Sequence, residues 1–153
     1  MNLDYALTLM DDLQILITTT SGIPVYAHPG DAGCDLRSSQ AGVIEPGERL
    51  TISTGVRIAV PDGFVGLVHS RSGLAAKHGI KVLNSPGTVD AGYRGEIQVT
   101  LLNTDKSEPF KIEVGDRIAQ MVFQRVERAR FIEVEHLPDS HRGEQGFGST
   151  GSK

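Results

Sequence analysis

The sequence predicts an all-β fold, a sandwich or barrel of short strands in one domain. Apolar residues recur at every second position, as in strands with one buried face; between positions 50 and 60 they are Leu50, Ile52, Val56, Ile58 and Val60. Gly, Pro, Asn and Asp separate such stretches at intervals of roughly ten residues, as in sandwiches and barrels. The 153 residues, 39% of them hydrophobic, suffice for one domain with its own core.

The expected strands follow this alternation along the chain: residues 50–60, 63–69, 97–101, 118–123 and 131–135. The second strand comes directly after the turn formed by Pro61 and Asp62. One short helix is expected after Ser70, with Ser72 as its capping residue and Gly79 as its end. Residues 84–95 are flanked by two strand-like stretches, which predicts a hairpin with a long loop.

The chain is expected to divide into a β domain, residues 1–138, and a flexible C-terminal arm, residues 139–153. The arm is rich in glycine and has one aromatic residue, Phe147, so it cannot bury a stripe of core residues. Such a segment is either disordered or ordered by a ligand.

Charge and cysteine content exclude several classes of function. The formal net charge is −4, which gives no broad basic surface for duplex nucleic acid. Cys34 is the single cysteine, so no intrachain disulfide can form, and we read it as a small apolar residue beside a turn. No apolar run reaches membrane-spanning length, and the N-terminus has no basic region. We therefore expect a soluble, cytoplasmic protein with neither nucleic acid nor membrane as partner.

Ser70, Arg71, Ser72 and Gly73 stand at the predicted start of the helix. Free N–H groups there favour an anion, and an arginine can bind two phosphate oxygens at once. An ordinary capped turn that carries a solvated arginine is the alternative for this segment taken alone.

The loop at residues 84–95 contains groups that can recognise a nucleoside. Its backbone can read a base edge, Tyr93 can pack on a sugar, and Asp90 can hold a water molecule. A turn that is rich in glycine and aspartate for conformational reasons alone is the alternative. In the arm, Arg142, Phe147, Ser149 and Thr150 would suit a lid over a nucleotide, and a disordered polar terminus is the alternative there.

Five segments together resemble dUTPases in order and spacing. They are residues 31–36 (DAGCDL), 70–75 (SRSGLA), 87–95 (GTVDAGYRG), 115–120 (GDRIAQ) and 142–149 (RGEQGFGS). The match extends from residue 24 to residue 151, and five segments in sequence are far more specific than any one of them.

The resemblance implies a jelly-roll-like subunit in a homotrimer with shared active sites, where the arm of one subunit closes over the site of a neighbour. It implies hydrolysis of dUTP to dUMP and pyrophosphate by water attack on the α-phosphorus. This reaction limits uracil incorporation into DNA and supplies dUMP for thymidylate synthesis. Mg²⁺ is the implied cofactor, bound through the triphosphate and waters with no direct protein ligand.

The resemblance also assigns roles to individual residues. Asp90 is the catalytic carboxylate that orients and deprotonates the attacking water, and Asp35 supports the site, by pairing with an arginine or through a metal-bound water. Tyr93 packs beneath the deoxyribose and excludes a 2′-hydroxyl. The remaining substrate-binding residues are Arg71, Ser72, Gly73, Asn84, Thr88, Gln120, Arg142, Phe147, Gly148, Ser149 and Thr150. Among these, Asn84 reads uracil, Phe147 stacks on it, and Arg142, Ser149 and Thr150 hold the γ-phosphate end.

The chain departs from the family pattern at two positions. Ser70 stands where dUTPases usually have proline, and we expect it to loosen the approach to the phosphate turn and to slow catalysis modestly. Gln145 stands where the arm commonly has a small residue, which predicts altered closure of the arm.

Two other functions compete with this interpretation. A dCTP deaminase would share the fold, but it needs a catalytic glutamate in the hairpin region, where this chain has Asp90. A nonenzymatic binding or signalling module would not need Asp90 at all.

Overall fold

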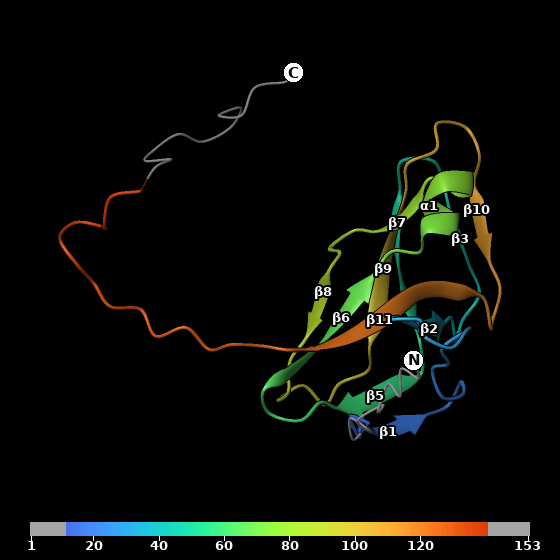
Figure 1. Cartoon of the computed structure of the whole chain (residues 1–153). Coiled ribbons are helices and arrows are strands. Elements are labelled where there is room, and N and C mark those ends of the chain that lie inside the picture. The colour runs from blue at the N-terminus through green and yellow to red at the C-terminus, as the bar shows by residue number, and fades with distance from the viewer. Residues whose placement is uncertain (1–11, 141–153) are drawn as a thin grey trace, which may run out of the picture.

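Eleven strands and one short helix form the described part of the chain, residues 12–140, in the computed structural model shown in Figure 1. The strands are β1 (Leu16–Thr19), β2 (Cys34–Arg37), β3 (Gly42–Ile44), β4 (Arg49–Ser53), β5 (Val56–Ala59), β6 (Phe64–His69), β7 (Ile80–Val82), β8 (Gly87–Val89), β9 (Gln98–Asn103), β10 (Phe110–Ile112) and β11 (Arg117–Arg125), and the helix is α1 (Ser72–His78).

All strand pairs are antiparallel. The largest sheet has the order β2–β11–β6–β8, a second has the order β4–β9–β7, and β1–β5 and β10–β3 form two-stranded sheets. One hydrophobic core takes side chains from both larger sheets, among them Leu36, Met121, Ile52 and Leu101, which are fully buried. The predicted all-β fold is confirmed, as a jelly-roll-like sandwich without a closed barrel.

The stretch predicted as one strand at residues 50–60 is two strands that belong to different sheets. β4 pairs with β9, whereas β5 pairs with β1. The chain changes sheet at Thr54, whose buried hydroxyl donates to the carbonyl of Ile97, and at Gly55, whose positive φ of 69° favours glycine. Because Thr54 is also buried at an even position, the alternation continues through the break and conceals it.

The capping residue of the helix lies one position before the expected one. Arg71 is the capping residue, in an extended conformation and without a side-chain hydrogen bond to the helix, and Ser72 is the first helical residue. The prediction that Ser72 caps the helix is therefore wrong. The predicted end is confirmed, since Gly79 has a left-handed φ of 64° and donates its N–H to the carbonyl of Ala75.

The region around residues 84–95 is not a simple hairpin. β7 and β9 do pair with each other, but β8, which lies between them in sequence, pairs with β6 in the other large sheet. The chain thus leaves one sheet, adds a strand to the other and returns. The loops at both ends of β8 are held by this crossing.

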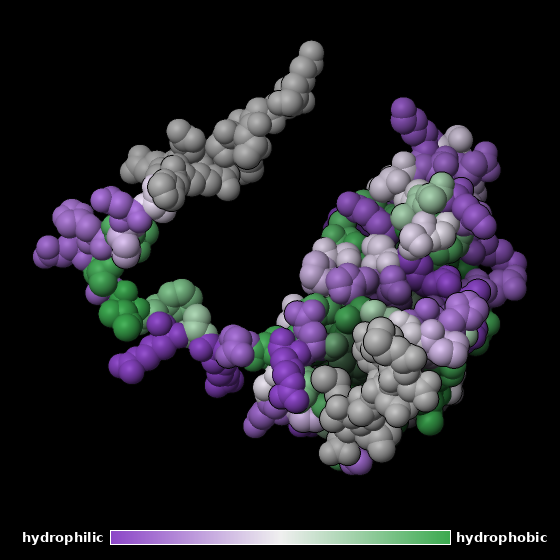
Figure 2. All heavy atoms as spheres, in the orientation of Figure 1, coloured by the Kyte–Doolittle hydropathy of each residue, from purple (hydrophilic) through white to green (hydrophobic). Residues whose placement is uncertain are grey.

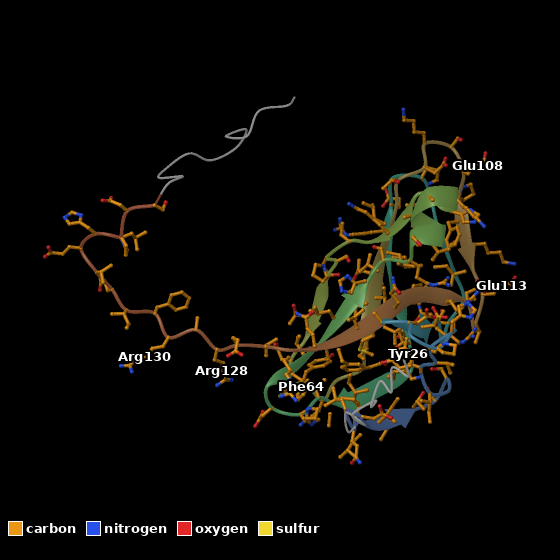
Figure 3. The ribbon with its side chains drawn as sticks, in the orientation of Figure 1. Tyr26, Phe64, Glu108, Glu113, Arg128 and Arg130 are labelled. Carbon is orange, nitrogen blue, oxygen red and sulfur yellow. The ribbon has the colours of Figure 1, made fainter. Side chains whose placement is uncertain are left out.

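No strand forms at residues 131–135, so that prediction is wrong. After β11 the chain runs away from the sheets as an extended segment (Figure 1), and Phe131 is 94% exposed. Arg128 and Arg130 lie on the same segment, away from the sheets (Figure 3). A strand needs a partner for its backbone, and residues 131–135 have none within the described chain.

Cys34 is the first residue of β2, directly after a loop with a turn at Pro29 and Gly30. It is buried, its thiol donates to the carbonyl of Met121, and burial raises the pKa of that thiol. Within residues 12–140 the single helix has seven residues, which is too short to cross a membrane.

Candidate active site

A polar pocket of about 690 Å³ opens where β6 ends and α1 begins. Its lining also includes a loop before β2, the Asp35 side chain on β2, and residues of β11. The predicted residues Asp35, Arg71, Ser72, Gly73 and Gln120 all line this pocket. The structure therefore brings together residues that are distant in sequence, such as Asp35 and Gln120, which are 85 positions apart.

Arg71 is fixed at the rim of the polar pocket by two contacts. Its Nε lies 3.2 Å from Oδ1 of Asp35, and its Nη1 donates to the carbonyl of Arg117 at 3.1 Å. Asp35 also pairs through Oδ2 with Nη1 of Arg117, at 3.4 Å, and its side chain is 15% exposed. One carboxylate thus lies between two guanidinium groups, and the remaining N–H groups of Arg71 can serve an anion.

Gln120 is held by the backbone of Ser70, the residue before Arg71. Its Nε2 donates to the carbonyl of Ser70 at 3.0 Å. Gly33 leaves space for this amide, because a Cβ at position 33 would lie 2.5 Å from Oε1 of Gln120. The Ser70 hydroxyl accepts the N–H of Val82, and this bond anchors the residue that precedes Arg71. The expected effect of Ser70 on the rate stays a prediction.

A second, smaller pocket of about 210 Å³ lies at β8 and its flanking loops. Asn84, Thr88, Asp90 and Tyr93 line it. Tyr93 is fixed at both ends, because its N–H donates to the carbonyl of Asp90 at 3.0 Å and its hydroxyl donates to the carbonyl of Glu96 at 2.8 Å. Within residues 12–140 the exposed carboxylate of Asp90 has neither a hydrogen-bond nor an ion-pair partner, so it can accept a bond from water.

The two pockets share no lining residue. The structure therefore divides the predicted site residues into two groups and does not unite them in one cavity of one chain. The remaining residues lie outside the described part of the chain: Arg142, Gln145, Phe147, Gly148, Ser149 and Thr150.

Arg117 and Glu96 are two residues that the sequence reasoning did not assign. Arg117 belongs to the segment 115–120, and its pairing with Asp35 could have been sought in that segment. Glu96 lines the smaller pocket, but its Oε1 accepts the N–H of Gly55 at 2.8 Å. Within residues 12–140 no three His, Cys, Asp or Glu side chains gather closely enough to hold a metal ion.

The family model described as dUTPase matches residues 19–151, most of the chain. The chain belongs to the dUTPase family. A deoxyuridine 5'-triphosphate nucleotidohydrolase of Thermobifida fusca is 64% identical over 129 residues, which cover 84% of this chain and 72% of that protein. The enzyme of the same name from Leifsonia xyli is 63% identical over 129 residues, which cover 84% of this chain and 85% of that protein. The resemblance seen in the five sequence segments is confirmed.

Solved structures of dUTPases share the fold. A point mutant of the Staphylococcus bacteriophage 80alpha dUTPase with dUpNHpp has a TM-score of 0.84 and 30% identity, and the match covers 90% of this chain and 98% of that one. A mutant dUTPase from phage phi11 of S. aureus, described with a structural Mg(II) ion, has a TM-score of 0.76 and 25% identity, with 82% of this chain and 99% of that one covered.

The position of Asp35 between two arginines predicts a stability effect. We expect Asp35→Asn to lower the free energy of unfolding by about 1–3 kcal/mol, because it leaves the partly buried guanidinium of Arg71 without its counterion and also removes the exposed pair with Arg117. The measurement is urea denaturation at fixed protein concentration. Glu113→Gln is the matched control. Glu113 lies in the loop before β11 (Figure 3), and its substitution removes an exposed ion pair with Lys111 of β10. Equal midpoints for the wild type and Asp35→Asn would contradict the prediction.

Proposed function

We propose that the two pockets together hydrolyse dUTP to dUMP and pyrophosphate, with water attacking the α-phosphorus. Hydrolysis of dUTP to dUMP is the reaction of the family to which the chain belongs. The observation that carries the proposal is the exposed Asp90 carboxylate beside the fixed ring of Tyr93 in the smaller pocket. The cellular role that follows is to limit uracil incorporation into DNA and to supply dUMP for thymidylate synthesis.

Asp90 acts as the general base. It follows β8 directly, so the paired strand fixes its backbone while its carboxylate stays exposed to water. The carboxylate accepts a proton from the attacking water as the oxygen approaches phosphorus. The new bond forms between this oxygen and the α-phosphorus, the bond from the α-phosphorus to the bridging oxygen breaks, and pyrophosphate leaves.

Tyr93 and Asn84 select the nucleoside. The Tyr93 ring is 46% exposed and rests over Gly95, where a Cβ would collide with the ring. Because Tyr93 is held at its backbone N–H and at its hydroxyl, its ring offers a rigid surface to a deoxyribose and leaves no room for a 2′-hydroxyl. Asn84 and Thr88 lie in the same pocket, where an amide and the neighbouring backbone can read the edge of uracil.

Arg71, Ser72, Gly73 and Gln120 bind the phosphates. Arg71 is held at its Nε and at Nη1, so its guanidinium is oriented before a ligand arrives. Ser72 and Gly73 stand in the first turn of α1. These groups would bind the region between the α- and β-phosphates, and Gln120 lies beside them.

Mg²⁺ is the proposed cofactor, bound through the triphosphate and waters. Asp35 of the polar pocket already pairs with two arginines, and among residues 12–140 no three His, Cys, Asp or Glu side chains gather closely enough to form a metal site of their own. Asp31 and Asp35 also balance the charges of Arg71 and Arg117, so the lining has no net formal charge with its histidines neutral. When bound, Mg²⁺ would offset the charge of the triphosphate.

The proposed assembly is a homotrimer with shared active sites. The proposed reaction uses both pockets, which one chain holds as separate cavities, and in the proposed assembly groups from different copies form each complete site. The extended segment after β11 supports assembly, since its apolar side chains are exposed (Figure 2): Phe131, Ile132, Val134 and Leu137. Such a segment is stabilised when another chain covers it.

We also propose a division of the chain into a β domain and a C-terminal arm, and a cytoplasmic location for the enzyme. Residues 1–138 would form the β domain, and residues 139–153 would close over the site of a neighbouring subunit, with Phe147 on uracil and Arg142, Gly148, Ser149 and Thr150 at the phosphates. The arm residues from 141 onward lie outside the described part of the chain. We place the enzyme in the cytoplasm, which fits a chain with a single cysteine.

The reaction predicts a specific substrate pattern. With Mg²⁺ present, we expect pyrophosphate release from dUTP and little release from UTP, dTTP or dCTP, because Tyr93 excludes a 2′-hydroxyl and the Asn84 pocket reads uracil. The measurement is a coupled pyrophosphate assay on the four nucleotides. Ammonia release from dCTP would indicate a deaminase instead. Binding of dUTP without turnover would indicate a binding module.

Asp90→Asn tests the general base. We expect turnover of dUTP to fall at least about a hundredfold, since a general base typically contributes that much or more, while dUTP still binds. Kinetics of pyrophosphate release and calorimetric binding measure the two effects. Glu96→Gln is the matched control in the same pocket, because an amide oxygen can still accept the N–H of Gly55 and hold the loop. Turnover by Asp90→Asn near the wild-type rate would refute the assigned role.

Deletion of residues 142–153 tests the arm. The deletion removes no core residue of the described domain, so we expect a folded trimer by light scattering with a severely reduced rate of dUTP hydrolysis. The reason is loss of Phe147 and of the proposed phosphate ligands in the arm. A truncated protein with near-normal turnover would show that the arm does not close the site.

A further inference from the structure

Ser70 connects three elements at the edge of the polar pocket. It follows the last residue of β6 and precedes Arg71, the capping residue of α1. Its hydroxyl accepts the N–H of Val82 on β7 at 2.8 Å, and its carbonyl accepts Nε2 of Gln120 on β11 at 3.0 Å. One residue therefore holds the phosphate turn to two strands that belong to different sheets.

The Ser70 hydroxyl gives a hydrogen-bond acceptor to the backbone N–H of Val82, which no neighbouring strand of its sheet can reach. The N–H of Leu83 donates to Thr100 on the β9 side of β7, so the preceding N–H, that of Val82, points to the opposite side. On that side β7 is the edge of its sheet. Val82 is only 2% exposed, and a buried N–H without a partner is costly. The Ser70 hydroxyl is the acceptor that meets this requirement.

The bond also has a geometric consequence for the site. β7 is anchored in its own sheet through β9, so the hydroxyl of Ser70 fastens the turn at Arg71 to a rigid strand. Without the hydroxyl, the link to β7 would be lost and the bond from Gln120 of β11 to the Ser70 carbonyl would remain. Small displacements of groups that bind a transition state lower the rate strongly.

We propose that Ser70 is a positioning residue, which holds Arg71, Ser72 and Gly73 in their productive place through its hydrogen bond to Val82. This inference rests on the proposed function, because the groups that it positions are the proposed phosphate ligands. In this role Ser70 touches no reacting atom. It acts through the turn that follows it.

Ser70→Ala and Ser70→Thr test the role of the hydroxyl. We expect kcat/KM for dUTP to fall about three- to tenfold in Ser70→Ala, the range for one lost hydrogen bond, and to stay close to wild type in Ser70→Thr, which keeps the hydroxyl. Thr104→Ala is the matched control, because it removes a hydroxyl bond to the carbonyl of Gly79 at the other end of α1. It should keep wild-type kcat/KM. Unchanged kcat/KM in Ser70→Ala, or an equal loss in Ser70→Thr or Thr104→Ala, would overturn the proposal.

Hydrogen exchange of the Val82 amide, followed by NMR, tests the contact without any variant. We expect slow exchange in the wild type, although this N–H points away from β9, and faster exchange in Ser70→Ala if that variant folds. Fast exchange in the wild type overturns the proposal even when Ser70→Ala cannot be purified. A wild type with a protected Val82 amide but no dUTP turnover would instead count against the proposed function and leave the contact standing.

Discussion

The polar pocket depends on the register of β11 between its two neighbours. Gln120 lies opposite Asp35 of β2 on one side and opposite His69 of β6 on the other. A shift by one residue would turn Gln120 to the other face of the sheet and replace it with a core residue, Ala119 or Met121. The buried face of β11 therefore fixes the position of a polar group, because burying the wrong face would cost the core its contacts.

The same register explains why the charged groups of the pocket are paired before a ligand binds. β11 begins at Arg117, so the strand that places Gln120 also brings a guanidinium to Asp35. Asp35 in turn orients Arg71. This pairing reduces the attraction of each arginine for an anion, but it fixes the direction of the N–H groups that remain. The pairing with Asp35 therefore orients the two arginines and lowers the net positive charge of the pocket.

Much of the fold follows from the alternation of apolar residues, and the departures from prediction have physical causes. The even positions from Ile52 to Val60 are buried as expected, yet the change of sheet at Thr54 is invisible because a buried threonine continues the pattern. Residues 131–135 alternate like a strand, but a strand also needs a partner, and a single sequence does not show whether the partner belongs to the same chain. The capping residue is Arg71 and not the predicted Ser72, because the position of the cap depends on the extended backbone conformation of Arg71.

The candidate site was predictable as a set of residues but not as an arrangement. The motifs contain Asp35, Arg71, Asp90 and Gln120, because their residue types and order resemble a known family. Their division between two pockets depends on which strands pair, which is a nonlocal property. The contact between Ser70 and Val82 was equally hidden, since it requires that β7 lie at a sheet edge and turn one N–H toward the end of β6.

Electrostatics gives a reason for the arm that is independent of sequence motifs. Two arginines and two aspartates cancel in the lining of the polar pocket, so one subunit supplies little net charge to hold a triphosphate. In the proposed reaction Mg²⁺ would neutralise part of the triphosphate, and further cationic groups would come from outside this pocket. Arg142 of the proposed arm would be such a group. A site that reaches full positive charge only when metal and arm are both present would bind the nucleotide and close over it in one coupled step.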